Sequence, residues 1–443
     1  MDLIILLYWV LAALLCVMMF YQGMTRKVDL FSIRNIYIAG FIVSQLISPA
    51  LSLKAEDYRG FSITDPMKAG KWMLFYNYIY ISIYLFSYHR IRASDWLARK
   101  FPRSAVSMSA SDSLLMGLAI STIAVAMAVR IIGLRIPLIA AISVNTSLAL
   151  ASVACAIIGW VWAARRVNPA VLLAVALVIS VSLFVSLSGF YSRRPLISVL
   201  AGFVWGAYHR WIKHQSPMKM LIGAIPAVLI VVGIVGAFTA IRSHETSSTE
   251  AMATVQQMRG ASISQGTGNL LGGQAVGAAA LWVIDSFPSK FDYRPLFGIK
   301  YMFYWWVPRA WWHDKPEPLS TEIATLARLR GVNRKGITLP PGVVGYASAE
   351  GGFYAVVIYA IFFGQFTRFF DSLVKLYPTN PFIILPVGCS TGQFLGLARG
   401  DISTFTTLAI VGFASSFLLI YFTAMAFGQS GSTPIRAPLP QPR

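Results

Sequence analysis

The feature that most constrains this chain is a series of eleven apolar stretches, each long enough to cross a bilayer as a helix. The hydrocarbon core is roughly 30 Å thick, and a helix rises about 1.5 Å per residue. The stretches cover residues 3–21, 35–53, 72–89, 113–133, 142–163, 169–190, 195–212, 220–240, 352–370, 380–398 and 402–427. The sequence therefore predicts an all-α polytopic membrane protein with about eleven transmembrane helices.

Composition supports this class. The chain is 56% hydrophobic and only 12% charged, with a mean hydropathy of +0.64, which departs from the usage of soluble globular proteins. Its three cysteines, Cys16, Cys155 and Cys389, all fall in apolar stretches and offer neither a disulfide framework nor a metal site. The first stretch has no basic region before it and no small-residue cleavage site, so we interpret it as a retained span.

The orientation follows from Lys and Arg in the short loops, which favour the cytoplasmic side. An outer N-terminus makes cytoplasmic the basic segments 26–34, 90–103, 165–166, 210–219, 368–375 and the tail. Eight spans then fill residues 1–240, a large outer loop covers 241–350, three spans fill 351–427, and the Pro-rich tail 428–443 is disordered in the cytoplasm. The net charge of +20 fits both this anchoring and attraction for an anionic substrate.

The large loop contains three segments with their own expectations. Leu270–Val283 is apolar but too short to span, so it lies on the membrane or re-enters it. Ser320 is expected to cap a short helix that has Glu322 in its first turn. Thr338–Tyr346, with its two prolines, is expected to form a turn-rich lead-in to the ninth span.

The segment Tyr301–Ser320 (YMFYWWVPRAWWHDKPEPLS) stands out in this loop, because it holds four Trp among cations, acids and prolines. Indole rings favour the membrane–water interface, where their N–H groups stay wet. Arg309, His313, Asp314 and Lys315 are therefore expected at the edge of the bilayer, where a lipid-linked pyrophosphate would also lie.

Three short segments resemble a known family, the Wzy-type polymerases of O-antigen and other oligosaccharide repeat units. SGFYSRRP at 188–195 is similar to their Ser-Gly-Ser-Arg segment, and VPRAWWHDKP at 307–316 is similar to their Pro-Arg-x-x-Trp-x-x-Lys-Pro segment. TLPPGVVG at 338–345, followed by Glu350-Gly-Gly352, resembles the end of their large outer loop. The Arg-x10-Gly spacing of some members occurs in the loops once, from Arg334 to Gly345.

The resemblance implies a fold related to membrane glycosyltransferases that use polyprenyl-linked donors, in a bacterial inner membrane with the large loop in the periplasm. The implied substrates are undecaprenyl-pyrophosphate-linked oligosaccharides, and the implied product is O-antigen or exopolysaccharide. It implies no metal or other cofactor and no nucleic acid. A chain-length regulator and a flippase are the implied protein partners, beside the lipid bilayer itself.

Such a transfer needs cations where pyrophosphate charge develops and a base for the acceptor hydroxyl. Arginine suits the first role because its planar fork binds phosphate through two hydrogen bonds. The candidates for binding pyrophosphate or glycan are Arg193, Arg194, Arg309, Arg242 and Arg399. The candidate bases are His313, because imidazole titrates near neutral pH, and Glu350, because a carboxylate at a helix mouth is partly desolvated.

Each candidate also has a structural interpretation. Arg193 and Arg194 could serve only as anchors whose side chains reach lipid headgroups. Arg309 could serve only as an anchor through cation–π contacts with the neighbouring Trp residues. His313 fits a loop hydrogen bond, and Glu350 fits a favourable charge at the positive N-terminus of the ninth helix.

Other functions remain open at this stage. An O-antigen ligase shares the chemistry and differs only in its acceptor. A flippase or transporter for lipid-linked oligosaccharides would carry ionisable groups or broken helices near the bilayer midplane, and often an internal repeat. Most charge in this chain lies at span ends and no repeat is evident. A channel would need a recognisable filter, and a scaffold would not need so many outer arginines.

The topology can be tested by cysteine labelling in a cysteine-free background. A cysteine at Ser247 is expected to react with an impermeant reagent from the periplasm, and one at Ser104 only after the cytoplasm is exposed. Labelling of both from one side would contradict the eleven-span arrangement.

Overall fold

The computed structural model of the 443-residue chain describes residues 2–101, 110–136, 140–187, 193–216, 218–220, 276–305, 307, 311–329, 338–400 and 402–427. Every regular element in these ranges is helical. Three further expectations, the eighth span at 220–240 beyond its first residue, the segment 270–275 and the tail 428–443, lie outside the described residues.

The helices group as follows. The first set is α1 (Asp2–Met24), α2 (Ile33–Phe41), the π-helix η1 (Ile42–Ile47), α3 (Ser48–Ala55), α4 (Pro66–Arg90) and α5 (Ala93–Arg99). The second is α6 (Asp112–Leu134), α7 (Ala140–Ala164), α8 (Pro169–Leu187), α9 (Arg193–Arg210) and the 3₁₀ turn η3 (Ile212–His214). The third is α13 (Val276–Ser286), α14 (Phe297–Tyr304), α15 (Leu319–Leu326), α16 (Gly342–Leu376), α17 (Pro381–Cys389), α18 (Thr391–Leu397) and α19 (Ile402–Phe427).

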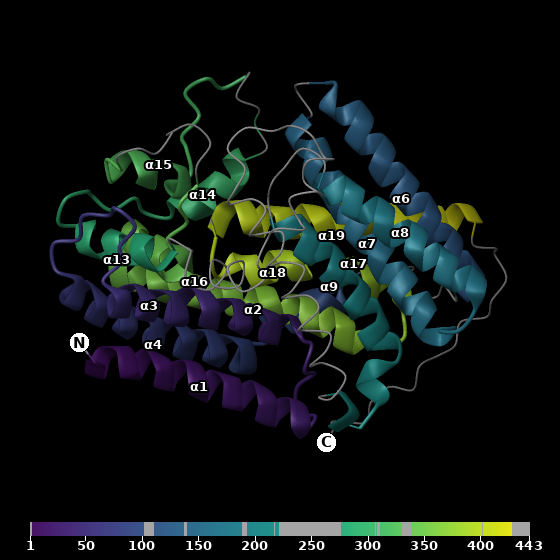
Figure 1. Cartoon of the computed structure of the whole chain (residues 1–443), viewed down its shortest axis with the longest axis horizontal. Coiled ribbons are helices and arrows are strands. Elements are labelled where there is room, and N and C mark those ends of the chain that lie inside the picture. Colours follow the sequence, from purple (N-terminus) through teal and green to yellow (C-terminus); the bar gives the residue numbers. More distant parts are fainter. Residues whose placement is uncertain are drawn as a thin grey trace, which may run out of the picture.

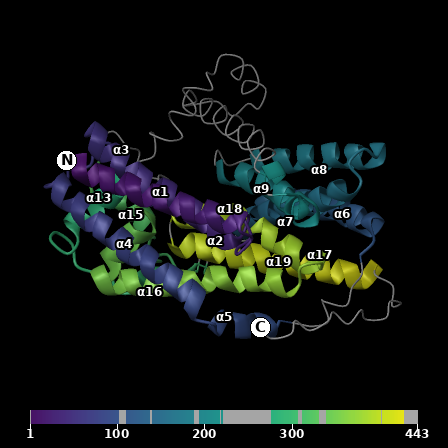
Figure 2. The ribbon, with the colours of Figure 1, turned by 90° about the horizontal axis from the view of Figure 1, so that it is seen from below.

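Figure 1 shows how these sets lie in space. Helices α6 to α9 form one group, α1 to α4 with α13 to α16 form the other, and α17 to α19 lie between them. Figure 2 shows α1, α4 and α16 running side by side, with α5 beyond the end of α4.

Seven helices in the described part of the chain are long and apolar enough to cross a membrane, which confirms a multi-pass helical membrane protein. They are α1, the continuous rod α2–η1–α3, α6, α7, α8, α16 and the 404–423 part of α19. Helices α4 and α9 match predicted spans in length, with 25 and 18 residues, but carry more polar side chains. The count of eleven stays a prediction.

The expected span 380–398 consists of two helices instead of one. Helix α17 ends at Cys389, α18 begins at Thr391, and Ser390 joins them. Pro386 lies inside α17, where its missing N–H and its ring weaken the helical ladder.

The expected turn-rich lead-in at 338–346 was wrong beyond Pro341. Residues Gly342 to Glu350 form the first part of α16, and each of them is buried. Pro340 and Pro341 precede this helix rather than preventing it, since proline is tolerated at a helix start. Burial between neighbouring helices then outweighs the turn propensity of the Pro-Pro-Gly sequence.

Helix α16 breaks directly after Glu350. Gly351 has φ 172° and ψ 23°, and Gly352 has φ 57° and ψ −134°, so neither has helical geometry. The positive φ of Gly352 is a conformation that residues with a Cβ rarely adopt. We call Gly342–Glu350 the half-helix, and the remainder of α16 runs on to Leu376.

Two expectations about the large loop can be compared with the structure. Helix α13 is buried from Val276 to Val283 and contacts α3, α4 and α16, so this part of the segment is enclosed by protein. The short helix near Ser320 exists as α15, but its N-cap is Pro318, so the expected Ser320 cap was wrong. The backbone N–H of Ser320 instead donates to the Tyr346 hydroxyl at 3.3 Å.

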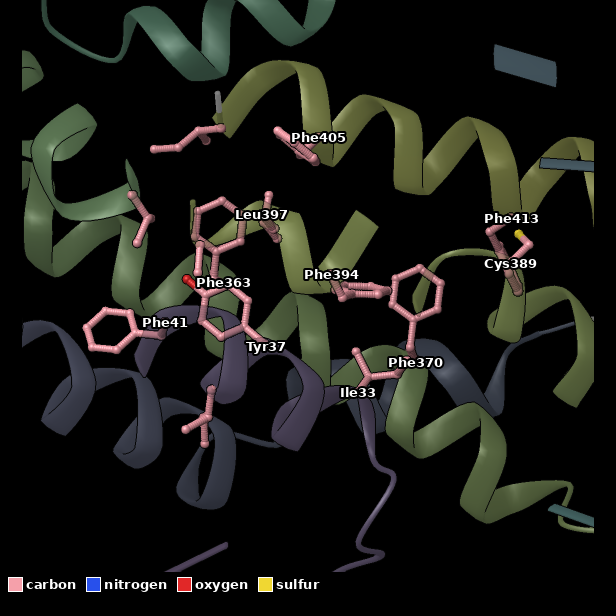
Figure 3. Packing of buried hydrophobic residues seen from close by; sticks show 14 of the residues in the cluster. Ile33, Tyr37, Phe41, Phe363, Phe370, Cys389, Phe394, Leu397, Phe405 and Phe413 are labelled. Atoms are coloured by element: carbon pink, nitrogen blue, oxygen red, sulfur yellow. The ribbon is translucent and has the colours of Figure 1, made fainter. Parts of the chain in front are cut away.

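The core between α2, α4 and α16 contains stacked aromatic rings (Figure 3). Tyr37 of α2 stacks on Tyr84 of α4 and on Phe363 of α16, with ring centroids 4.9 and 6.0 Å apart. The hydroxyls are paired as well: Tyr37 with Tyr80 at 2.5 Å and Tyr84 with Thr367 at 2.9 Å. These contacts bury polar tips without leaving them unsatisfied.

Substitution of Gly352 by Ala is expected to destabilise the protein by about 1 to 3 kcal/mol, because φ would be strained. The added Cβ would also lie 2.8 Å from the Tyr293 hydroxyl. Gly351→Ala is the matched control, since its φ is extended and its Cβ meets only Ala355 at 3.3 Å. Thermal unfolding in detergent should show a clearly lower Tm for Gly352→Ala; equal Tm values would contradict the strain argument.

Candidate functional site

The break in α16 places the carboxylate of Glu350 in the protein interior. Its side chain is only 2% exposed. One carboxylate oxygen, Oε1, accepts a hydrogen bond from the backbone N–H of Gly298 at 2.7 Å, and Oε2 accepts one from the Tyr359 hydroxyl at 2.7 Å. A buried carboxylate is costly unless it is hydrogen-bonded, so these two donors hold it in place.

Gly298 can donate because it lies in the first turn of α14, where backbone N–H groups have no intrahelical partner. The positive N-terminal end of a helix dipole also favours an anion. Glu350 was expected to meet the start of the ninth helix, but it meets the start of α14. A Cβ at position 298 would lie 2.8 Å from Oε1 of Glu350, so glycine permits this close approach.

The loop before α14 covers the break. The backbone N–H of Arg294 donates to the carbonyl of Ala349 at 3.2 Å. The Tyr293 hydroxyl lies near Gly352, where an added Cβ would meet it at 2.8 Å and the Tyr76 hydroxyl at 3.7 Å. Two tyrosine hydroxyls, one from this loop and one from α4, therefore lie beside the break.

Two cations stand close to this region. Arg294 forms an ion pair with Glu322 of α15, and both side chains are partly exposed. Lys315 is 8% exposed, and its ammonium donates to the carbonyls of Trp305 and Val307 at 3.1 and 2.9 Å. These carbonyls lie at and beyond the C-terminal end of α14, where a cation is favourable.

Helix α14 is therefore held at both ends by charge. The carboxylate of Glu350 lies at its N-terminus and the ammonium of Lys315 lies at its C-terminus. Lys315 is also 5.5 Å from the ring centroid of Tyr301, one turn along α14 from Gly298. The Trp segment and the broken helix thus belong to one site.

The structure describes the side chains of three predicted site residues. Glu350 is buried at the break, and His313 is exposed in the turn that precedes Lys315. Arg399 is partly buried in the connection between α18 and α19, next to Ala398, whose carbonyl accepts the backbone N–H of Val343 at 3.1 Å. Arg399 and Glu350 thus lie near opposite ends of the half-helix.

The other predicted residues are not placed. Arg193 and Arg194 begin α9, but their side chains lie outside the described residues. Arg242 and Arg309 also lie outside them. Their roles in binding pyrophosphate stay predictions.

Four residues of the site were not predicted from the sequence. Gly298, Arg294 and Tyr293 sit in a part of the loop that has no recognised motif. Tyr359 lies nine residues after Glu350, and only a break in the helix brings the two side chains together. The Gly351-Gly352 pair was the signal that could have suggested this break.

The arrangement brings together a buried carboxylate, neighbouring hydroxyls and nearby cations. In the described ranges, no group of three or more His, Cys, Asp and Glu side chains is placed to hold a metal ion. No known protein family, curated protein or solved structure matches the chain. The function is therefore argued from the geometry of this site and from the sequence segments that surround it.

Replacement of Lys315 by Met should loosen the segment that holds the Trp residues, because two hydrogen bonds from a charged donor are lost. Such bonds are worth about 1.5 to 3 kcal/mol each, so chymotrypsin cleavage at Trp311 and Trp312 should accelerate at least tenfold. Lys300→Met is the control, since Lys300 is an exposed lysine on α14. Equal cleavage rates in the two variants would show that Lys315 does not hold the segment.

Proposed function

We propose that this protein is a membrane glycosyltransferase that polymerises undecaprenyl-pyrophosphate-linked oligosaccharide repeat units at the periplasmic face of the bacterial inner membrane. The observation that carries the proposal is the buried carboxylate of Glu350 at the break in α16, linked through α14 to the Trp-rich segment. The three sequence segments similar to repeat-unit polymerases support it.

The role proposed for Glu350 is that of general base. Its carboxylate takes the proton of the acceptor hydroxyl while the hydroxyl oxygen bonds to the anomeric carbon of the donor glycan. The bond from that carbon to the pyrophosphate oxygen breaks, and the electron pair leaves with the pyrophosphate. Each carboxylate oxygen has a second lone pair besides the one used with Gly298 or Tyr359, and the proton later passes to water.

The cations are proposed to stabilise the leaving group. Pyrophosphate gains charge as the glycosidic bond breaks, and charge-assisted hydrogen bonds are strongest where water is excluded. Arg309 lies in sequence between Val307 and Lys315, and the ammonium of Lys315 donates to the carbonyl of Val307. Arg193, Arg194, Arg242 and Arg399 are further proposed contacts to pyrophosphate or glycan.

A transporter of lipid-linked oligosaccharides is the second candidate, and specific observations favour it. Discontinuous helices are typical of transporters, and this chain has a break in α16, a joint between α17 and α18, and a π-helix within the α2 rod. Unlike a polymerase, a transporter would move the repeat unit across the bilayer without changing the number of sugars.

The decisive experiment uses the full-length protein in proteoliposomes with an undecaprenyl-pyrophosphate-linked repeat unit. Wild type is expected to give a ladder of longer glycans. Glu350→Gln should lose roughly 10²- to 10⁴-fold in rate, and Arg309→Lys roughly 10²- to 10³-fold, because an ammonium cannot form the paired hydrogen bonds. Glu56→Gln, an exposed carboxylate in another loop, is the matched control and should retain activity.

The other outcomes are equally informative. Normal ladders from both Glu350→Gln and Arg309→Lys, at matched amounts of inserted protein, would remove these residues from the mechanism. Transbilayer movement of intact repeat units, without a ladder, would establish the transporter. A transfer that occurs only when lipid A core is supplied would establish a ligase.

A further inference from the structure

A polar cavity lies at the end of α16 that is far from Glu350. It has a volume of about 500 Å³ and lies between the C-terminal ends of α1, α4 and α16 and the short helix α5. Its walls carry the basic side chains of Lys27, His89, Arg99, Arg368 and Lys375 against a single acid, Asp95. Such an excess of positive charge favours an anionic ligand.

This cavity is separate from the site around Glu350. The cavity residue Ser372 follows Gly352 by 20 residues, which is about 30 Å along a helix and matches the thickness of the hydrocarbon core. The two sites therefore lie at opposite faces of the membrane. The basic short loops predict that the cavity faces the cytoplasm.

One wall of the cavity is fixed by an ion pair. The guanidinium of Arg368 donates to both carboxylate oxygens of Asp95, at 2.9 and 2.6 Å. The Ser372 hydroxyl donates to Oδ1 of Asp95 at 2.5 Å. Burial alone would raise the pKa of Asp95, but the hydrogen bonds from Arg368 and Ser372 outweigh it and hold this pKa below its usual range. Asp95 is thus ionised and balances the charge of Arg368.

Behind the lining residues Gln22 and His89 lies a buried cation, Arg34. Arg34 is fully buried, and its guanidinium donates to Asn35 and to Gln22, with an Nη1 to His89 Nε2 distance of 3.2 Å. No carboxylate in the described part of the chain lies within ion-pair distance of this guanidinium. The backbone N–H of Arg34 does bond to Asp371, which also accepts the Tyr88 hydroxyl at 2.8 Å.

Two of the lining cations, Arg99 and Lys375, lie at the rim of the cavity. Arg99 and Lys375 are exposed, and within the described ranges neither forms an ion pair. Among the lining cations in the described part of the chain, Arg368 is the one that forms an ion pair with a carboxylate. A ligand that carries at least one negative charge would compensate the rest.

The cavity also lies at the depth of lipid headgroups. Trp96 and Leu97 of α5 are 59% and 52% exposed, which is typical of a helix at the membrane–water interface. Lys100 lies 3.7 Å from the ring centroid of Trp96. Basic pockets between transmembrane helices on the cytoplasmic side are suited to anionic headgroups.

We infer that this cavity binds the phosphate group of an anionic phospholipid from the cytoplasmic leaflet. The phosphate lies against Arg99 and Lys375 at the rim, above the fixed Arg368–Asp95 pair, and the acyl chains remain in the bilayer beside α5. The inference does not depend on the proposed enzymatic activity.

The test measures lipid binding to the purified full-length protein by native mass spectrometry. The probes are dioleoylphosphatidylglycerol and, as a neutral lipid, dioleoylphosphatidylcholine. The variant combines Arg99→Gln with Lys375→Gln, and the matched control combines Arg90→Gln with Lys219→Gln. The control removes the same charge from exposed residues of the same predicted face that do not line the cavity.

Phosphatidylglycerol is expected to bind wild type and control with equal affinity. The cavity variant should bind it about 25-fold more weakly, because each Lys or Arg near an anionic headgroup contributes roughly fivefold. Unchanged elution on size exclusion confirms that the variant is folded. Equal affinity of variant and control would overturn the inference, since the cations would then act only as diffuse surface charge. Equal binding of phosphatidylcholine to wild type would also overturn it.

Competition with inorganic phosphate distinguishes a lipid headgroup from a soluble phosphate compound as the ligand of the cavity. Competition by millimolar phosphate against phosphatidylglycerol in wild type, but not in the cavity variant, would support recognition of the phosphate group. Phosphate binding by wild type without phosphatidylglycerol binding would assign the cavity to a soluble phosphate compound and overturn the lipid as its ligand. Absence of binding by either probe would overturn the site altogether.

Discussion

The hydrogen bond between Glu350 and the first turn of α14 is the contact on which the packing of α14 and the residues that follow it depends. A carboxylate that is 2% exposed needs donors, and the helix break directly after Glu350 lets it reach one on α14 and one on α16. Gly298 and Tyr359 supply the donors. Because α14 is anchored in this way, the loop that follows can be held at its other end by Lys315. The carboxylate of Glu350 and the ammonium of Lys315 thus hold the two ends of α14.

The half-helix is the common support for several loop elements. Val343 bonds to Ala398 at the end of α18, Gly345 packs against Ala280 of α13, and Tyr346 bonds to Ser320 of α15. These partners are 26 to 65 residues apart in sequence from the half-helix. Nine buried residues therefore bring together segments that no local propensity would join.

The sequence predicted the parts of this protein that depend on local patterns. Long apolar stretches predicted a multi-pass helical protein, and Glu350 was singled out as a carboxylate at a helix mouth. The helical state of Gly342–Glu350 was not predicted from the sequence. Turn propensity after Pro340-Pro341 can be recognised locally in the sequence, whereas burial between helices that are distant in sequence cannot. The pairing of Arg368 with Asp95, 273 residues apart, was beyond prediction for the same reason. Likewise, only the broken path of α16 brings Tyr359 to Glu350.

The tyrosines of α4 have a consequence for how this protein can move. Tyr80, Tyr84 and Tyr88 recur every fourth residue, and their hydroxyls pair with Tyr37 on α2 and with Thr367 and Asp371 on α16. Sliding α4 by one turn, about 5.4 Å, would detach all three pairs at once. The three helices are therefore locked in axial register and must travel as a rigid unit. Helices α17 and α18 lie outside this unit and meet at Ser390, between the two groups of helices.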